Sequence, residues 1–376
     1  MMEADQHGEH VVAHLRQAIT AAGGWLPFSR YMDIALYEPG LGYYSAGARK
    51  LGPDGDFVTA PEISPLFGRT LARQVREVLA AGLPEVLEIG AGSGALAASL
   101  LEELEKLGAL PERYLILELS ADLRERSRDT IAARVPHLME RVAWLNQLPP
   151  SFSGLALGNE VLDAMPVHVV QARAGELEEL GVALGPSGEF RFLPRRAEGE
   201  LLLAALPLGL PEGYRTEIGL VARAFIRSLA ERLERGVVLF IDYGFPAREF
   251  YHSERREGTL MCHHRHRAHP DPFLHPGLQD ITSHVDFSAI ARAGHESGLA
   301  LAGYASQTQF LVNCGITDLL AETSPEDASK YLPLTNQANR LLSPAEMGEL
   351  FKVIAMTKGW DGPLLGFRNG DRSDTL

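Results

Sequence analysis

One nine-residue stretch limits the fold of this chain more than any other. It runs from Val86 to Gly94 and reads VLEIGAGSG, an apolar segment that ends in three glycines at alternate positions. Such an apolar run is typical of a buried parallel strand, and the residues from Ala95 to Leu101 then follow the pattern of a helix. Glycines let the backbone turn tightly and approach a ligand closely. The stretch therefore predicts a strand, a turn and a helix of an α/β fold, built around a nucleotide-like ligand.

The acid that precedes the glycines narrows the choice of ligand. Glu88 gives the spacing Glu-x-Gly-x-Gly-x-Gly, which differs from the Gly-x-Gly-x-x-Gly of dinucleotide-binding turns. A carboxylate just before the turn suits a pyrophosphate poorly, which disfavours an NAD-dependent oxidoreductase. The spacing resembles motif I of S-adenosylmethionine (SAM) methyltransferases, whose ligand has no phosphate. The alternative without a ligand is an ordinary tight connection between a strand and a helix.

Strand and helix patterns alternate after this first pair. They predict a strand at Tyr114–Leu119, a charged helix from Leu123 to Arg134, and strands at Val142–Leu145 and Gly154–Gly158. The alternation then stops. Hairpin-like strands, Val167–Val170 and Phe190–Leu193, lie around a turn at Gly185–Gly188 and indicate an inserted β-rich subdomain.

The parallel pattern resumes in the second half of the chain. We expect a helix from Glu217 to Arg235, ended by Gly236, and then a strand at Val237–Ile241 that is followed by Asp242. Two late strands, Gln309–Asn313 and Leu350–Met356, are expected to close the sheet as an antiparallel pair. The first residues of the chain predict a helix near Val11–Ala22 and then mostly loop from Tyr37 to Pro65.

Polar residues at the strand ends are the candidates for binding the methyl donor, because ligands of open α/β sheets bind beyond the carboxyl ends of the strands. Glu118 lies at the end of the second predicted strand, 24 residues after Gly94, and is expected to accept hydrogen bonds from ribose hydroxyls. The alternative is a solvated loop acid. Asn146 follows the third strand and could contact an adenine edge, although Asn is also a common turn residue.

A second set of polar residues could face the methyl acceptor. The methyl of a sulfonium is already activated, so the enzyme mainly aligns a nucleophile and excludes water. If the acceptor is a guanidinium, carboxylates are needed to hold it bidentately. Glu160, Asp163 and Asp242 could supply them, next to Asn159. For Asn159 and Asp163 the alternative role is the capping of a following helix.

Histidines are concentrated in one segment, where residues 252–284 hold seven of the thirteen. A metal site is disfavoured and none is assigned, because arginines interleave with the histidines of 263–269 and because Pro270 and Pro272 indicate a loop. We expect instead a substrate-facing loop. Its polar cluster comprises Asp280, His284 and Asp286.

Composition bounds the classes of partner. A formal net charge of -14 argues against nucleic acid as a partner. It is compatible with a cationic substrate, such as a protein with a reactive Arg or Lys, although solubility explains the charge equally well. No apolar run approaches the roughly 20 residues of a membrane span. Neither a signal peptide nor a transit peptide is recognisable in MMEADQHGEH, so a cytoplasmic location is expected.

The two cysteines, Cys262 and Cys314, favour reduced thiols over a disulfide framework. The residues do not decide the oligomeric state, and a homodimer is one of the states that they leave open.

Several ordered motifs extend the resemblance beyond VLEIGAGSG. They are Tyr31-Met32, Ala35-Leu36-Tyr37 with Gly42-Tyr43-Tyr44, GDFVTAPEISPLFG (Gly55–Gly68), GNEVLDAMPV (Gly158–Val167), IDYGFP (Ile241–Pro246), GTL (Gly258–Leu260) and QDITSHVDF (Gln279–Phe287). In this order they resemble the MidA-type family of SAM-dependent methyltransferases, which includes mitochondrial complex I assembly factors, over nearly the whole chain. The run His263–His269 departs from the family by its many His and Arg residues.

The resemblance implies an α/β fold with a class I SAM-methyltransferase (Rossmann-like) seven-stranded sheet. It also implies an N-terminal extension over residues 1–80 that covers the cofactor site, and a methyltransferase domain over 81–376 with a β-rich insertion at 166–215. The implied function is methyl transfer from SAM to an arginine of a protein substrate. The alternative is a non-catalytic, SAM-binding assembly factor or chaperone for a respiratory-type complex.

Residues with expected roles fall into two sets. Those expected to bind SAM are Thr59, Pro61, Glu62, Ser64, Glu88, Gly90, Gly92, Gly94, Glu118, Asn146 and Asn159. Those expected on the acceptor side are Asn159, Glu160, Asp163 and Asp242.

Overall fold

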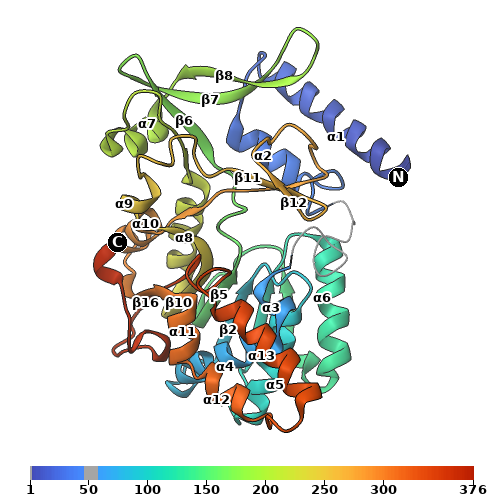
Figure 1. Cartoon of the computed structure of the whole chain (residues 1–376), viewed down its shortest axis with the longest axis vertical. Helices are drawn as coiled ribbons and strands as arrows, with labels where there is room; N and C mark the ends of the chain where they lie inside the picture. Colours follow the sequence, from blue (N-terminus) through green and yellow to red (C-terminus); the bar gives the residue numbers. More distant parts are fainter. Residues whose placement is uncertain (1, 46–57) are drawn as a thin grey trace. The chain divides into compact units, whose positions relative to one another are not determined.

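The computed structural model describes residues 2–45 and 58–376, with the side chains of residues 2–5 left out. The described chain forms two compact units. Figure 1 colours the chain along its sequence, so that the segments of each unit can be found by their residue numbers. Unit 1 comprises residues 1–57, 162–224 and 245–286, and unit 2 comprises residues 58–161, 225–244 and 287–376. Gly55–Phe57 of the motif GDFVTAPEISPLFG, and residues 46–57 of the loop expected between Tyr37 and Pro65, lie outside the described residues, and the described part of that loop contains the short helix at Ala60–Ile63.

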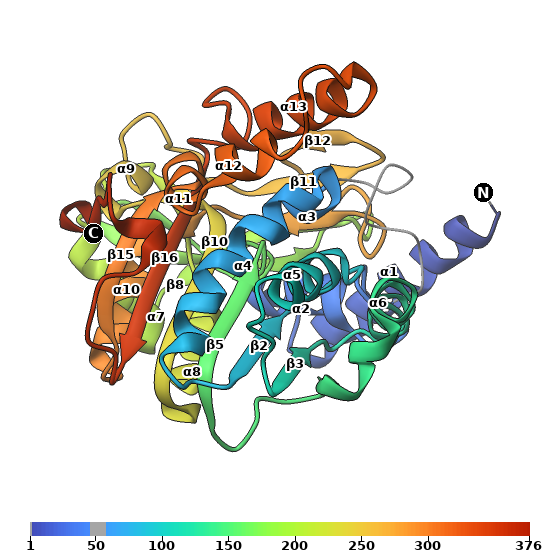
Figure 2. The same ribbon diagram turned by 90° about the horizontal axis from the view of Figure 1, so that it is seen from below.

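Unit 2 is built on a mixed sheet whose main path runs β15-β16-β10-β5-β2-β3-β4 (Figure 2). The strands β10, β5, β2, β3 and β4 pair in parallel, whereas β16 pairs antiparallel with both β10 and β15. The strands are β2 (Glu85–Ile89), β3 (Arg113–Leu117), β4 (Val142–Leu145), β5 (Phe152–Asn159), β10 (Leu233–Phe245), β15 (Ala300–Ser306) and β16 (Phe351–Lys358). The α/β class predicted from the sequence is confirmed.

Two helices of unit 2, α3 (Ala60–Ile63) and α4 (Pro65–Ala80), precede its first strand, and the others lie between or after the strands along the chain. The others are α5 (Ala95–Lys106), α6 (Ala121–Arg134), α10 (Phe287–Glu296), α11 (Gln307–Asn313), α12 (Ile316–Ala321) and α13 (Ala328–Leu342), with 3-10 turns η1 (Pro136–Arg141), η3 (Leu365–Phe367) and η4 (Ser373–Thr375). The boundary between the units falls within α8 (Leu220–Arg232).

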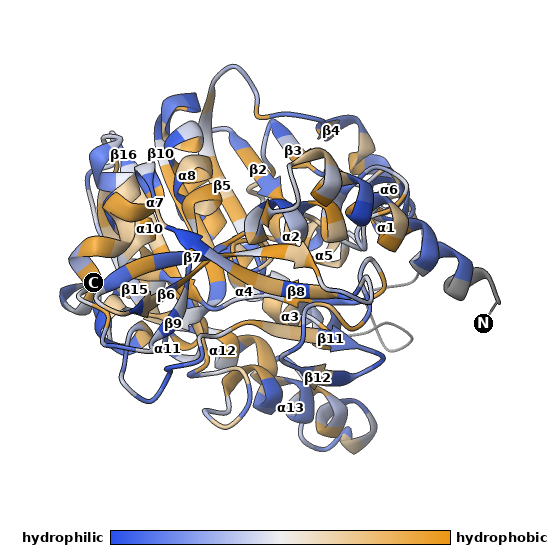
Figure 3. Ribbon diagram, turned by 90° about the horizontal axis from the view of Figure 1, so that it is seen from above, coloured by the Kyte–Doolittle hydropathy of each residue, from blue (hydrophilic) through white to orange (hydrophobic). Residues whose placement is uncertain are grey.

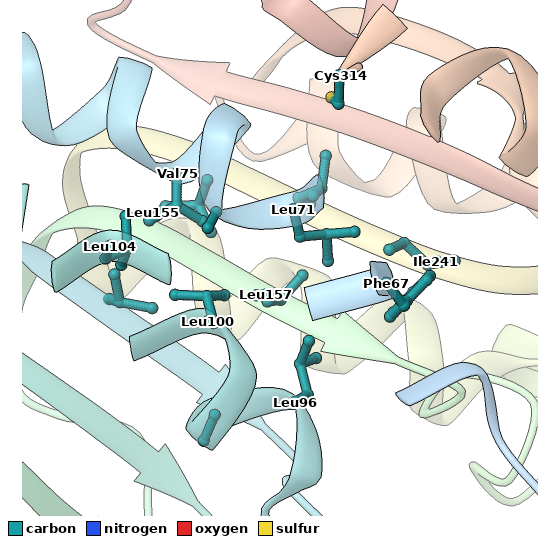
Figure 4. Close-up of a cluster of buried hydrophobic side chains, with 14 of the residues drawn as sticks. Phe67, Leu71, Val75, Leu96, Leu100, Leu104, Leu155, Leu157, Ile241 and Cys314 are labelled. Carbon is teal, nitrogen blue, oxygen red and sulfur yellow. The ribbon is translucent and has the colours of Figure 1, made fainter. Parts of the chain in front are cut away.

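The core of unit 2 lies between α4, α5 and the central strands. Figure 4 shows Leu71 and Val75 of α4 and Leu100 of α5 among the residues that pack against Leu155 and Leu157 of β5. The colouring of Figure 3 shows the hydrophobic character of β5 and β2. Parallel strands are covered on both faces, and every residue of β2 is accordingly buried, its two glutamates included. This core holds the parallel strands in place and thereby fixes the position of their carboxyl ends.

Unit 1 holds two smaller sheets. One pairs β1-β7-β6-β9 with β8 beside β7, and the other pairs β12-β11-β13. The elements are α1 (Met2–Ala21), β1 (Leu26–Pro27), α2 (Phe28–Tyr37), β6 (His168–Arg173), β7 (Glu176–Leu184), β8 (Phe190–Arg196), α7 (Gly199–Ala205), η2 (Leu206–Leu208), β9 (Arg215–Ile218), α9 (Ala247–Phe250), β11 (Met261–His264), β12 (Arg267–His269), β13 (Asp280–Thr282) and β14 (Val285–Asp286). No helix among the described residues is long and apolar enough to span a membrane.

One predicted strand is wrong. Residues 309–313 lie in α11, and the strand that pairs with β16 is β15, a little earlier in the chain. Ser306 ends the strand and begins the helix, because its hydroxyl accepts a hydrogen bond from the backbone N–H of Gln309 at 3.3 Å. The N-cap at Ser306 therefore starts a helix, although the apolar run that follows it had predicted a strand.

Two further boundaries differ from prediction. The helix expected over 217–235 is limited to α8, since Glu217 lies in β9 and residues 233–235 already belong to β10. Gly236 lies within β10 with φ 146°, and a Cβ there would lie 1.8 Å from the Gly154 carbonyl oxygen of the neighbouring strand. This glycine therefore allows a close approach of two strands and does not end a helix.

The bounds predicted for the N-terminal extension, 1–80, and for the insertion, 166–215, differ from the bounds of the two compact units. Residues 58–80 belong to unit 2, where α4 packs in the core. Residues 166–215 belong to unit 1, together with 1–57 and 245–286. Unit 1 thus gathers three segments that are separate in the sequence.

Candidate functional site

The glycine turn after β2 has a backbone that other residues would adopt only with strain. The φ angles of Gly90, Gly92 and Gly94 are 67°, 55° and 82°, in the left-handed region that glycine enters without cost. At Gly94 space is also lacking, since a Cβ would lie 2.8 Å from the Cα of Ser127. The turn is therefore fixed by its glycines, and α5 begins directly after it.

Glu118 is tied to this turn. β3 lies beside β2, with Leu117 opposite Ile89, so that Glu118 leaves its strand next to the turn. Its carboxylate accepts hydrogen bonds from the backbone N–H groups of Ser120, at 3.0 Å, and of Gly92. Burial raises the pKa of Glu118, and these backbone bonds partly oppose the effect. The carboxylate predicted to bind ribose is thus held beside the glycines.

Glu88 lies within β2 and is 2% exposed. The Tyr114 hydroxyl of β3 donates a hydrogen bond to its Oε2 at 2.6 Å. Burial raises the pKa of Glu88 to about 7; the Tyr114 bond lowers it and the charge of Glu118 raises it. Glu88 is therefore an interior acid of the sheet.

The segment 59–64 forms α3 and the start of α4. Glu62 of α3 accepts a hydrogen bond from the Ser93 hydroxyl of the glycine turn. Thr59 precedes α3 and Pro61 lies in its first turn. Ser64 caps α4, because its hydroxyl accepts the backbone N–H of Leu66 at 3.2 Å. Of these four predicted cofactor-binding residues, the structure joins the Glu62 side chain directly to the turn.

Asn159 and Glu160 lie at the carboxyl end of β5. The register places Gly158 opposite Ile89, the last residue of β2, and Asn159 opposite Ile241 of β10, whereas β10 itself continues to Phe245. The Asn159 amide donates to Glu160 Oε1 at 3.0 Å, and the Ala60 N–H donates to the same oxygen at 3.3 Å. These two residues therefore lie beside the glycine turn.

Asp242 follows Ile241 and is fully buried. Its Oδ2 accepts the backbone N–H of Val161 at 3.1 Å and its Oδ1 that of Tyr243 at 2.9 Å. These bonds hold the chain that leaves β5. The strand predicted at Val237–Ile241 runs on to Phe245, so Asp242 lies within β10 and not after it, and its carboxylate has backbone partners there.

The other candidates have partners of their own or lie at the surface. Asp163 belongs to unit 1, where its backbone carbonyl accepts the N–H of Ser283 at 3.0 Å. Asn146 is exposed directly after β4. Asp280 and Asp286, also in unit 1, accept hydrogen bonds from different hydroxyls, those of Tyr44 and Tyr251, each at 2.9 Å.

The histidine-rich segment forms strands where a loop was expected. Residues 261–269 make a hairpin of β11 and β12, and Arg265 and His266 at its turn have φ 50° and 60°, as a two-residue hairpin turn demands. Among the described residues, no group of three or more His, Cys, Asp and Glu is arranged to hold a metal ion. The interleaved arginines occupy the turn and the start of β12.

Two residues that donate hydrogen bonds to predicted site residues were not predicted from the sequence. Ser93 donates to Glu62, and Tyr114 donates to Glu88. Ser93 stands within VLEIGAGSG itself, and Tyr114 opens the second predicted strand. A hydroxyl inside a glycine turn is the signal that could have pointed to Ser93, whereas the Tyr114 contact depends on the register of β2 and β3.

The charges around the turn limit the ligand that fits. Three carboxylates, those of Glu62, Glu88 and Glu118, bond to the turn or lie in the strands that meet at it. Anions of phosphate type would be repelled by this set, whereas hydroxyl and ammonium groups would find acceptors. The residues therefore fit a nucleoside with an amino-acid tail and no phosphate.

A family comparison identifies the ligand. The sequence model of the Methyltransf_28 family, described as S-adenosyl-L-methionine-dependent methyltransferases, matches residues 66–305. The chain belongs to this family. The match includes the glycine turn, Glu118, Asn159 and Asp242. The enzyme is thus a SAM-dependent methyltransferase, and SAM is its cofactor.

Curated relatives cover almost the whole methyltransferase. The protein arginine methyltransferase NDUFAF7 homolog of Drosophila melanogaster, a mitochondrial protein, is 29% identical, with 94% of this chain and 86% of that protein covered. The mitochondrial NDUFAF7 of Bos taurus is 30% identical, with 92% of this chain and 83% of that protein covered.

Solved structures agree with the fold. A COG1565 superfamily member from Burkholderia thailandensis, bound to S-adenosyl-homocysteine, has a TM-score of 0.96 at 53% identity, with 100% of this chain and 98% of that chain covered. A native crystal structure of a COG1565 protein from the same organism has a TM-score of 0.94 at 52% identity, with the same coverage.

Proposed function

We propose that this methyltransferase transfers a methyl group to an arginine of a protein substrate. One observation carries the proposal: the relatives named protein arginine methyltransferase align over 92–94% of this chain at 29–30% identity. The carboxylates of Glu160, after β5, and of Asp242, bonded to the Val161 N–H, and the net charge of -14, add support because they suit a cationic acceptor.

We further propose that the main sheet path of unit 2 is the seven-stranded class I methyltransferase sheet. Its parallel order with an antiparallel β16 between β10 and β15 supports this assignment. Unit 1 would then supply the N-terminal extension and the β-rich insertion. SAM supplies a methyl group on a sulfonium, which is activated for transfer to a nucleophile.

In this proposal the glycine turn and its neighbours hold the methyl donor. The turn of Gly90, Gly92 and Gly94 approaches the ligand with its backbone, and Glu118 accepts hydrogen bonds from ribose hydroxyls. The other members of the proposed donor set are Thr59, Pro61, Glu62, Ser64, Glu88, Asn146 and Asn159. Glu62 supports the turn through Ser93, and Ser64 acts by capping α4.

On the acceptor side we place Asn159, Glu160 and Asp242, and Asp163 stays a member predicted from its position in the sequence. Oxygen acceptors of this set, directly or by positioning a neighbouring side chain, would orient the guanidinium so that one of its nitrogens faces the methyl. Asp242 would act through the backbone of Val161, to which it is bonded. We also retain as predictions a cytoplasmic location, testable by cell fractionation, and the absence of nucleic-acid and membrane partners. The oligomeric state, including a homodimer, is testable by light scattering.

Methyl-labelled SAM tests the proposed function. Purified protein is incubated with labelled SAM and a cell extract, and the labelled band and residue are identified by mass spectrometry. Label on the arginine of a protein is the expected result, and a Gly92→Val enzyme should give none because its turn cannot form. Label on another residue type or on a small molecule would refute the arginine assignment. A partner that binds the Gly92→Val protein without any methyl transfer by the wild type would favour the assembly-factor alternative.

A further inference from the structure

The Asn159 carboxamide has one oxygen for which the protein supplies no donor. Oδ1 is buried and lacks a hydrogen-bond partner within the described residues. Buried polar atoms are nearly always hydrogen-bonded, so such an exception calls for an explanation. A bound molecule that carries an N–H group would satisfy this oxygen.

The orientation of the carboxamide is fixed by Glu160. Asn159 Nδ2 donates to Glu160 Oε1 at 3.0 Å, and this same oxygen accepts the Ala60 N–H at 3.3 Å. Because Oε1 already accepts a backbone N–H, the atom of Asn159 that faces it must be the nitrogen. The oxygen of the carboxamide is therefore the atom left for a ligand.

Glu160 holds this arrangement in a strained backbone conformation. Its φ of 53° is left-handed, which is unusual for a residue with a side chain. Its N–H donates to the Ile241 carbonyl at 2.9 Å, and its side chain binds both Asn159 and the start of α3. Strain of this kind persists where surrounding contacts enforce it and concentrates at functional sites.

The acceptor oxygen lies where ligands of such sheets bind. Gly158 is opposite Ile89, the last residue of β2, so Asn159 leaves β5 beside the first glycine of the turn. The Val161 side chain is close to that glycine as well, since a Cβ on Gly90 would lie 3.1 Å from it.

We propose that Asn159 Oδ1 is the acceptor for an N–H group of a bound reactant and that Glu160 is a positioning residue that acts only through Asn159. The inference rests on the proposed function. Two sources carry the required N–H chemistry: the methyl donor, through its ammonium group or its adenine amino group, and the nitrogen of the methyl acceptor. In either case Glu160 aims the carboxamide and does not itself bind the reactant.

A double-mutant cycle tests this proposal. The proteins are the wild type, Asn159→Ala, Glu160→Ala, the double variant and Glu160→Gln, with circular dichroism as the check on folding. Affinity for S-adenosyl-homocysteine, which carries the ammonium group, is measured by calorimetry. Methyl transfer is measured with labelled SAM at saturation and cell extract, whichever residue receives the label, so that a failed arginine assignment does not affect the outcome.

We expect each alanine variant to lose about tenfold in one of the two measurements, and the double variant to lose no more than Asn159→Ala alone. Glu160→Gln should stay within about threefold of the wild type, because its amide oxygen can still accept from Asn159 and Ala60. Loss of S-adenosyl-homocysteine affinity identifies the methyl donor as the source of the N–H group, and loss of transfer alone identifies the acceptor nitrogen. Additive losses in the double variant, or folded alanine variants equal to the wild type in both measurements, would overturn the proposal.

Discussion

The substitution Glu88→Gln should make the stability of the enzyme less dependent on pH. Glu88 is buried within β2, and its pKa is raised from 4.5 to about 7, mainly by burial. The glutamine has nearly the same shape and keeps an oxygen that can accept the Tyr114 hydroxyl. The variant therefore removes the titration of this group with little change in packing.

The sign follows from proton binding in the two states. Between pH 4.5 and 7 the folded chain holds a proton on Glu88 that the unfolded chain has released. The free energy of unfolding therefore falls as the pH rises through this interval and is constant above it. An interval of about 2.5 pH units corresponds to about 3 kcal/mol, at 1.36 kcal/mol per unit. Most of this change lies between pH 5 and pH 8.

Urea unfolding of both proteins at several pH values between 5 and 8 measures the effect. We expect Glu88→Gln to gain about 2 to 3 kcal/mol relative to the wild type on going from pH 5 to pH 8. Glu217, whose pKa is also raised by burial, titrates in both proteins and cancels in the difference. The charge of Glu118 acts on Glu88, so its coupling to that group is part of the measured difference. Tyr114→Phe is the matched control, because loss of its hydrogen bond should raise the pKa of Glu88 further. Parallel pH curves for the wild type and Glu88→Gln would refute the reasoning.

Three further predictions concern the same unit. Gly94→Ala should lower the free energy of unfolding by about 1 to 3 kcal/mol in urea, because its Cβ would lie 2.8 Å from Ser127 and its φ is 82°; an unchanged midpoint would contradict the contact. Gly92→Val should abolish binding of S-adenosyl-homocysteine in calorimetry and leave circular dichroism unchanged, whereas retained binding would show that this turn does not hold the ligand. Leu100→Ala in the core of Figure 4 should cost about 2 to 5 kcal/mol in the same urea assay, as cavities in cores do; a loss below 1 kcal/mol would mean that the site collapses to fill the cavity.

Much of unit 2 could be predicted from local sequence patterns. The strand predicted at Val142–Leu145 has the bounds of β4, and the glycine turn connects β2 to α5. Both succeed because a buried parallel strand and a glycine turn depend on residues that are neighbours in the chain. The prediction at 309–313 failed because one N-capping serine outweighed an apolar run.

The sequence by itself determined the cofactor class, since the acid and the glycine spacing are local features that a phosphate ligand does not suit. Only the tertiary structure decided which polar side chains lie close together at the ligand site. The register of β2, β5 and β10 brings the turn, Asn159 and Asp242 to one edge of the sheet. It also leaves Asp163, four residues after Asn159, in the other unit. Contacts between strands that are distant in sequence depend on this register, and no local pattern records it.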